Sequence, residues 1–471
     1  MKYFYLFFLI HLKSMTYAQN LITDFGAIPD GKTLNTTAIQ SAIDNCFAKG
    51  GGKVIVPKGT FLTGTIVLKT GVNLHFTEGA ILLGSSRRED YQKHDWYALI
   101  LAKSQKNIKI TGSGVIDGQG KLLAEDVTRL WKSGVLKNVK PHNRPDENHR
   151  PQIIEMTDCQ GITLENVTIK NAACWVQTYH NCRELTLNKV RVESTAYWNN
   201  DGIDIVDCQK VRIKNCCINS ADDGICLKSQ GIKSRCEDIK IERCTIRSSA
   251  SAFKIGTASY GGFKHIRVKN LYIYDTYRSA IALECVDGGI LEDVKIKNIT
   301  AKNTGNALFI RLGNRYGKQP GVVKDIFIKN LTAEIPQNKP DTGYDTEGPP
   351  ADSVSNLLPS SIVGLPNNLI KNVHLNDINI TFYGGGKSLN AGQNTRQNIG
   401  QNTPPKVPEL PQAYPEFSMF GELPAWGFYL RHTEGVHFTR VKLKLIEKDY
   451  RQPIVLDDAS KTVLKKIKIV D

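Results

Sequence analysis

Two similar stretches of the chain place acidic residues close together. One runs Asn-Asn-Asp-Gly-Ile-Asp over residues 199–204, and the other runs Ala-Asp-Asp-Gly-Ile-Cys over residues 221–226, 22 residues later. If each stretch belongs to one turn of a parallel coil, then Asp201, Asp222 and Asp223 lie on one face. Three carboxyl groups in one cleft indicate acid–base chemistry of the kind that cleaves a glycosidic bond.

Packed carboxyl groups cannot all ionise easily, so one of the three should have a raised pKa and hold a proton near neutral pH. That group would act as a general acid, and the others, kept ionised by nearby lysines, would activate water. Two alternatives remain open, because aspartate also caps turns and binds calcium. An Asp-Gly pair alone is a weak turn signal, but three aspartates on two stacked turns are harder to explain in this way.

The strand that follows the acids carries further candidate residues. Alignment of this strand across successive turns places Asp201, Asp223 and Ser251 in one column, with outward-facing residues at alternate positions beyond them. Neighbouring turns lie about 4.8 Å apart, so these side chains form one face, on which Trp175 could stack on a sugar ring. We expect the substrate-binding residues to be Asn199, Asn200, Asp204, Lys228, Ser251, Lys254, Glu284, Arg311 and Trp175.

A repeat of about 27 residues must position these acids. Its first strand begins near Leu185, Val211, Ile239, Ile266 and Val294, at intervals of 26, 28, 27 and 28 residues. Each repeat contains three strands with apolar residues at alternate positions, which specify a right-handed parallel β-helix. We therefore expect an all-β fold: a single right-handed parallel β-helix, with a short N-terminal capping helix over residues 37–48 and long loops near the C-terminal end.

The predicted domains follow this pattern. Residues 1–18 have the composition of a signal peptide, with an apolar run that is too short to span a bilayer. Residues 19–106 form the N-terminal cap and first coils, and residues 107–471 form the catalytic β-helix. Loop insertions at about 336–360 and 384–424 interrupt it. Within the second insertion, residues 414–421 are too apolar for a free linker, and we expect them to pack on the β-helix. We expect export to the periplasm, the cell surface or the medium, and no later stretch is apolar enough to be a membrane span.

Two ladders of side chains are expected inside and along the coils. A cysteine recurs with two residues between it and the first aliphatic residue of a strand, in a slot that later holds large apolar residues, so these thiols should be buried rather than crosslinked. Asparagine recurs before the second strand and should form hydrogen bonds along the stack. The cysteines are Cys159, Cys182, Cys208 and Cys236, and the asparagines are Asn166, Asn215, Asn270, Asn298 and Asn330.

The chain is basic, with a formal net charge of +15 and a sequence pI of about 9.2. This balance favours an acidic partner. Lysine and arginine are spread along the whole chain and no nucleic-acid module is present, so we expect no nucleic acid as partner. No Cys/His spacing indicates zinc, and no glycine-rich phosphate loop indicates a nucleotide. We expect neither a metal nor a cofactor, and a monomeric protein.

From Asp24 to Arg431, the sequence resembles glycoside hydrolase family 28, the polygalacturonase-like pectin hydrolases. Residues 199–201 are similar to the family's Asn-Thr-Asp motif, residues 222–223 match its Asp-Asp motif, and the turns at residues 50–52 and 114–118 also fit. The resemblance implies hydrolysis with inversion of a pectic polysaccharide, galacturonan or rhamnogalacturonan, from the plant cell wall. It makes Asp222 the general acid, and Asp201 and Asp223 the pair that holds and deprotonates the attacking water.

The chain departs from the family pattern at two places. The family's Gly-His-Gly falls on Ala250-Ser251-Ala252, and its Arg-Ile-Lys falls on Ala282-Leu283-Glu284. The cations that would grip a galacturonate carboxylate are therefore absent, although Lys254 and Arg311 could replace them. These changes favour a rhamnogalacturonan or another decorated pectin over plain homogalacturonan.

Two other functions stay open. A pectic polysaccharide lyase would use calcium-binding acids with Lys228 or Lys254 as the base. A non-catalytic β-helix would only bind glycans, which the missing histidine and cations would favour. Fold alone does not decide among the three functions.

Overall fold

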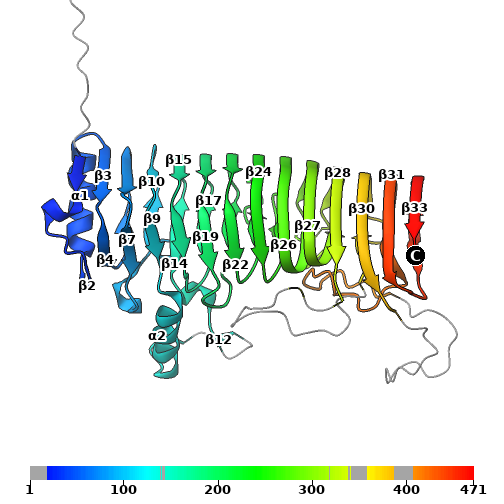
Figure 1. The fold of residues 1–471 in the computed structure, drawn as a ribbon, viewed down its shortest axis with the longest axis horizontal. Helices are drawn as coiled ribbons and strands as arrows, with labels where there is room; N and C mark the ends of the chain where they lie inside the picture. The colour runs from blue at the N-terminus through cyan, green and yellow to red at the C-terminus, as the bar shows by residue number, and fades with distance from the viewer. Residues whose placement is uncertain are drawn as a thin grey trace, which may run out of the picture.

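The computed structural model describes residues 19–137, 139–140, 144–317, 319–337, 340, 358–386 and 407–471. These residues form a long stack of coils, with the N-terminal end at one side of Figure 1 and the C-terminal end at the other. Within the stack, strands of successive coils pair in parallel. The parallel β-helix predicted from the repeat is therefore confirmed.

Each coil contributes a strand to each of three columns. The first column contains β1 Gln19–Leu21, β3 Gly52–Val56, β6 Val72–Phe76, β10 Lys109–Gly112, β15 Gln160–Glu165, β18 Arg183–Asn188, β21 Gln209–Lys214 and β33 Val463–Val470. The second contains β2 Asp30–Leu34, β4 Gly59–Thr63, β7 Ala80–Gly84, β11 Val115–Asp117, β16 Thr168–Lys170, β19 Arg191–Ser194 and β22 Cys217–Ser220. The third contains β5 Ile66–Val67, β9 Tyr97–Lys103, β14 Gln152–Thr157, β17 Gln177–His180, β20 Ile203–Val206, β23 Ile225–Ser229, β25 Phe253–Ser259, β29 Ser360–Val363 and β32 Gln452–Ser460.

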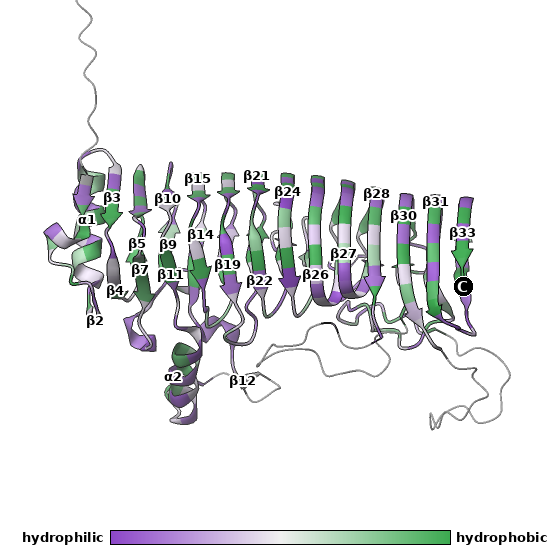
Figure 2. Cartoon of the chain, in the orientation of Figure 1, coloured by the Kyte–Doolittle hydropathy of each residue, from purple (hydrophilic) through white to green (hydrophobic). Residues whose placement is uncertain are grey.

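Longer strands pass through more than one column. They are β24 Cys236–Ser248, β26 Phe263–Cys285, β27 Ile290–Leu312, β28 Val322–Ile335, β30 Ile370–Gly384 and β31 Ala425–Glu447. The second half of β33 likewise lies in the second column. Along the strands, hydrophilic and hydrophobic residues alternate (Figure 2). The apolar ones point inward and form one core along the stack, as expected for period-2 strands with one face buried.

The asparagine column lies at the corners between the first and second strands. All five predicted asparagines have left-handed backbone angles, with φ between 55° and 61°. Asparagine tolerates this conformation better than most residues do. Asn330 donates to Asn298 at 3.0 Å, and Asn298 donates to Asn270 at 2.9 Å, so the predicted ladder exists in these coils.

The cysteine ladder is also confirmed. All eleven cysteines are free thiols, and the four in the predicted slot are buried. In this ladder the backbone N–H of Cys182 donates to the sulfur of Cys208 at 3.3 Å. The thiols therefore pack in the core as small apolar groups.

In the described part of the chain, two α-helices lie outside the strand columns. Helix α1, Thr36–Ala48, covers the first coils with Ile39, Ala42 and Ile43 buried, as predicted. Helix α2, Gly120–Lys132, projects from the side of the stack and was not predicted. Short connecting elements are β8 Gln92–Lys93, β12 Val139–Lys140, β13 Arg144–Pro145 and the 3-10 turns Ile22–Phe25, Arg88–Asp90 and Glu147–His149.

Residues 407–423 form a segment without regular structure that we call the strap. It packs on the outside of the coils through Phe417, Phe420 and Leu423, which are buried against Phe309 and Tyr429. The prediction that residues 414–421 pack on the β-helix is thus confirmed.

Some predictions cannot be compared with the structure. The signal peptide over residues 1–18 lies outside the described residues, as do residues 341–357 and 387–406 of the two predicted loops. The domain boundaries therefore stay predictions. Among the described residues, no helix is long and apolar enough to cross a membrane.

Candidate active site

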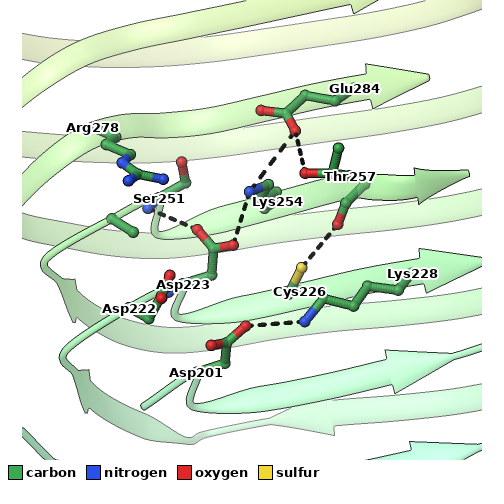
Figure 3. A network of polar contacts seen from close by, with 12 residues as sticks. Asp201, Asp222, Asp223, Cys226, Lys228, Ser251, Lys254, Thr257, Arg278 and Glu284 are labelled. Carbon is green, nitrogen blue, oxygen red and sulfur yellow. Dashed lines mark hydrogen bonds and ion pairs between the residues drawn. The ribbon is translucent and has the colours of Figure 1, made fainter. Parts of the chain in front are cut away.

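The three acids lie on the turns that lead into the third strands of two stacked coils (Figure 3). The backbone N–H of Gly202 donates to the carbonyl of Asp223 at 2.8 Å, which holds the two turns in register. A Cβ on Gly202 would lie 2.6 Å from the carbonyl oxygen of Gly224, so the Asp-Gly pair allows the close approach of the turns. One oxygen each of Asp201, Asp222 and Asp223 lies within 4.8 Å of the others.

Asp222 is the partly exposed member of the group. Its Oδ1 accepts a hydrogen bond from the backbone N–H of Asp223 at 2.8 Å, and its Oδ2 accepts one from Asn199 at 3.3 Å. Asn199 in turn accepts from the guanidinium of Arg150 at 2.7 Å. Burial, and then the charge of Asp223, raise the pKa of the Asp222 carboxyl above its usual range.

Asp223 lies beside a cation. Its Oδ2 is 3.0 Å from Nζ of Lys254, and its Oδ1 accepts from the backbone N–H of Ser251 at 3.0 Å. Burial alone would raise the pKa of Asp223, but Lys254, Arg278 and Lys228 together outweigh it and hold that pKa below the ordinary value. Two neighbouring carboxyls thus have pKa values that shift in opposite directions.

Asp201 shares one cation with a second carboxyl. Nζ of Lys228 lies 3.0 Å from Asp201 and also forms an ion pair with Asp204. One ammonium is shared by two buried carboxyls, so the effect of burial outweighs the charge of Lys228. The pKa of Asp201 rises well above its usual range, and that of Asp204 rises to about 6. Lys228 also lies 3.9 Å from the ring centroid of Trp175, and that ring stacks on Trp96.

Three residues of the site were not predicted from the sequence. Nε of Arg278 lies 2.7 Å from Glu416 of the strap, and Nζ of Lys254 lies 3.3 Å from the hydroxyl of Tyr414. Arg278 points toward the acids (Figure 3). It stands two coils beyond Asp222 in the same column, so extension of the alignment by two coils would have found it. No local signal in the sequence marks Tyr414 or Glu416.

Four predicted substrate-binding residues lie inside the protein. Asn200 is fully buried, and its amide binds the carbonyls of Ala172 and Cys174. Asp204 is fully buried beside Lys228, and Glu284 is 2% exposed. Arg311 is 1% exposed and donates to the carbonyls of Gly364, Glu409 and Leu410. Asn200 and Arg311 bind backbone carbonyls, whereas Asp204 and Glu284 lie beside Lys228 and Lys254. Substrate binding by these four buried residues stays a prediction.

The other predicted residues stay near the acids. Four of them contact an acid directly, namely Asn199, Lys228, Ser251 and Lys254. The fifth, Trp175, lies against the cation of Lys228. In Ser251 the contact is made by the backbone N–H and not by the hydroxyl. The oxygens of the three aspartates are also close enough to hold a cation together, so the absence of a metal stays a prediction.

Comparison with known proteins places this arrangement in a family. Residues 46–278, which include all three acids, match the family model for glycosyl hydrolases family 28. The chain belongs to glycosyl hydrolase family 28. This membership confirms the resemblance drawn from the Asn-Asn-Asp and Asp-Asp motifs.

Among the relatives of this chain, a probable polygalacturonase of Vitis vinifera is 27% identical over 60% of each chain. An exo-poly-α-D-galacturonosidase of Dickeya chrysanthemi is 28% identical over 43% of this chain and 41% of its own length. The chain thus spans about half the length of these two relatives. The fold is also similar to a family 28 exopolygalacturonase structure from Yersinia enterocolitica, with a TM-score of 0.60 at 20% identity, over 96% of this chain and 78% of that one.

Proposed function

We propose that this protein is an exported glycosidase that hydrolyses O-glycosidic bonds in a pectic polysaccharide. The observation that carries this proposal is the opposite pKa shift of two adjacent carboxyls, Asp222 and Asp223. Two titratable groups whose environments separate their pKa values are the usual basis for assigning an acid and a base. The relatives whose names describe polygalacturonase activity support pectin as the substrate class.

In the proposed reaction, Asp222 donates its proton to the glycosidic oxygen as the bond to the sugar breaks. Asp223, held ionised by Lys254, takes a proton from the attacking water. The raised pKa of Asp201 does not fit a second base, so Asp201 binds and orients the water instead. Protons balance, because Asp222 gives one to the leaving sugar and Asp223 receives one from the water.

Inversion at the anomeric carbon is part of the proposal. The carboxyl groups of inverting glycosidases usually stand roughly 6.5–9.5 Å apart, whereas the nearest oxygens of these acids lie within 4.8 Å. The water would therefore sit to one side of Asp201 and Asp223 and not between opposed acids. Proton NMR of the first-formed sugar anomer tests this point, and a retained anomer would contradict it.

We propose that the guanidinium of Arg278 binds a carboxylate of the substrate. It is partly exposed, with 23% of its side chain accessible, and it lies in the column of Asp222. Both Lys254 and Arg311, the cations proposed from the sequence, are almost fully buried. A galacturonan or a rhamnogalacturonan would each present a uronate carboxylate to this guanidinium.

The lyase alternative is disfavoured by the lysines. A lyase base must be neutral near the working pH, but the acids beside Lys228 and Lys254 outweigh burial and raise the pKa of both. A non-catalytic glycan binder would have no need for an acid and a base with separated pKa values.

The test is a panel of de-esterified polygalacturonate, rhamnogalacturonan and decorated pectin fragments, followed with two readouts. Hydrolysis releases reducing ends without new ultraviolet absorbance, whereas elimination creates an unsaturated product that absorbs. We expect reducing ends only, at an unchanged rate when calcium is chelated. Binding without either product would overturn the proposal in favour of a glycan-binding protein.

A further inference from the structure

A second charged surface lies on the first strand of each coil, on a different strand from the one that follows the acids. The strand register pairs Arg212 with Lys240, Lys240 with Arg267, and Arg267 with Lys295. Four successive coils therefore place a cation at the same position. Because parallel strands are about 4.8 Å apart, these charges form a straight row along the axis of the stack.

A second row runs beside the first. Two residues further along the same strands, the register pairs Lys269 with Lys297 and Lys297 with Lys329. All three of these lysines are exposed. We call the two sets the cation rows: Arg212, Lys240, Arg267 and Lys295, with Lys269, Lys297 and Lys329.

The cation rows are only partly neutralised within the protein. Arg267 contacts Asp293 at 2.5 Å, and Lys269 contacts Glu242 at 3.0 Å. Arg212, Lys240 and Lys297 make no ion pair within the described part of the chain. Like charges at paired positions of neighbouring strands destabilise a sheet, so this arrangement costs the fold free energy unless an anion binds.

The surface is hollowed where the cations lie. One hollow, of about 380 Å³, is lined by five of these cations and by Glu242 as its single acid. Another, of about 500 Å³, is lined by Arg212, Lys210 and Lys240 together with Glu184 and Asp238. Because Lys240 belongs to both, the two hollows form one strip along several coils.

We propose that the cation rows bind a linear polyuronate chain that lies along the β-helix axis, separately from the three acids. A polymer with one carboxylate per sugar presents a regular row of negative charges, which matches a regular row of cations. The choice of polyuronate over other polyanions rests on the proposed function. The row that ends at Lys295 continues on the next coils as Phe327, His374 and His437. These rings stack on one another, so they do not offer the open faces on which bases stack in sites for single-stranded nucleic acid.

The binding test uses protein that cannot cut its ligand. In an Asp222→Asn background, the triple variant Arg212→Gln, Lys240→Gln, Lys297→Gln removes three exposed cations that form no ion pair with any described residue. We expect about tenfold weaker binding to immobilised de-esterified polygalacturonate at low salt, and a weaker dependence of binding on salt.

The matched control is Lys49→Gln, Lys58→Gln, Lys132→Gln, which removes three exposed lysines elsewhere and should bind as the parent does. If the triple variant melts early, Lys240→Gln alone replaces it.

Three results would overturn the proposal: unchanged binding in the triple variant, an equal loss in the control, or tighter binding of a single-stranded oligonucleotide than of polygalacturonate. With Asp222 intact, the triple variant should keep the parent kcat and KM on short oligogalacturonides, which are too short to reach both sites. Failure of the proposed function would appear instead as the absence of reducing ends, while binding to the cation rows could still be measured.

Discussion

At the scale of single residues, the site depends on a lysine that neutralises the charge of one aspartate and not that of its neighbour. Lys254 lies beside Asp223, whereas Asp222 accepts hydrogen bonds from an amide side chain and a backbone N–H and has no cation in direct contact. Asp223 is the more buried of the two, yet its lysine favours the ionised form, whereas Asp222 favours a proton. Adjacent residues in the chain acquire different roles because the next coil supplies a lysine to only one of them.

The first prediction concerns Asp222→Asn. The amide is close in size to the carboxyl and its oxygen can keep one of the two accepted hydrogen bonds, but its N–H is far too weak an acid to protonate the leaving oxygen. Release of reducing ends should fall about a hundred- to ten-thousandfold, and the melting temperature should not fall. Wild-type activity in this variant would show that Asp222 is not the acid.

The second prediction concerns the pH dependence of hydrolysis. Asp223 must be ionised, so activity falls as the pH drops through its lowered pKa, and Asp222 must be protonated, so activity falls as the pH rises through its raised pKa. Arg278 lowers the pKa of Asp222, so Arg278→Ala should move the alkaline limb to higher pH. Profiles of kcat measure this shift, and Arg315→Ala, which removes an arginine bound to Asp287, should leave the limb in place.

The third prediction concerns stability. Burial raises the pKa of Glu284 to about 7, against the opposing charge of Lys254. The folded state therefore holds a proton that the unfolded chain loses above its ordinary pKa, so stability decreases as the pH rises from about 4.5 to about 7. Glu284→Gln cannot ionise, so it should melt at a higher temperature than the parent at pH 8 and at a similar temperature at pH 4.5. Equal melting curves at both pH values would contradict the assignment.

Alignment of the repeats predicted which residues of the coils lie near one another in the site. Asp201, Asp222, Asp223, Lys228 and Lys254 came together because the strand period and the coil spacing fix their positions. Whether an outward-facing side chain reaches solvent could not be predicted in this way. Arg311 follows the alternation, yet carbonyl groups of the strap and of residue 364 surround it.

At the scale of elements, the strap is the part that completes the site from a distance. It brings Tyr414 and Glu416 to Lys254 and Arg278, more than 130 residues away in sequence. Its position depends on apolar side chains, since Phe417, Phe420 and Leu423 are buried against the coils. The sequence showed that this segment is too apolar for a free linker, but not which coil it contacts, because no repeat fixes its register.

The fourth prediction tests that attachment. Phe420→Ala removes a ring that is 6% exposed and lies 5.1 Å from the guanidinium of Arg311. Loss of a buried phenyl group costs about 3–5 kcal/mol where the site cannot collapse. Hydrogen exchange within residues 407–423 should accelerate, while exchange in β24 and β26 should not change. Uniform acceleration over the whole chain would show that the strap does not open separately. Leu122→Ala, on the exposed side of α2, is the control.

At the scale of the whole molecule, the two ends of the stack differ. Helix α1 covers the first coils, whereas β33 pairs only with β31 in the described chain. Such an edge strand invites pairing with another chain, and lysines along it oppose that pairing. Lys465 and Lys468 are exposed on β33, so they should oppose pairing of this strand with another chain.

The fifth prediction follows from this arrangement. Lys465→Thr with Lys468→Thr should keep the strand but remove its charges, and light scattering should then show association that grows with protein concentration. The matched control is Lys442→Thr with Lys444→Thr, on the neighbouring strand β31, whose edges are both paired. A monomeric edge variant, or equal association of the control, would contradict the role of these lysines.

The overall architecture was the most predictable part of the protein, because the same strand pattern recurs many times along the chain. Helix α2 was missed because it occurs once, outside that pattern. In such a stack each coil contacts mainly the two beside it, and the three acids occupy only two neighbouring coils. A whole coil duplicated or lost beyond residue 312 would change the length of the rod without altering the spacing of Asp201, Asp222 and Asp223. Such a change would preserve the three acids, but the strap that brings Tyr414 and Glu416 to the site would then have to pack on a different set of coils.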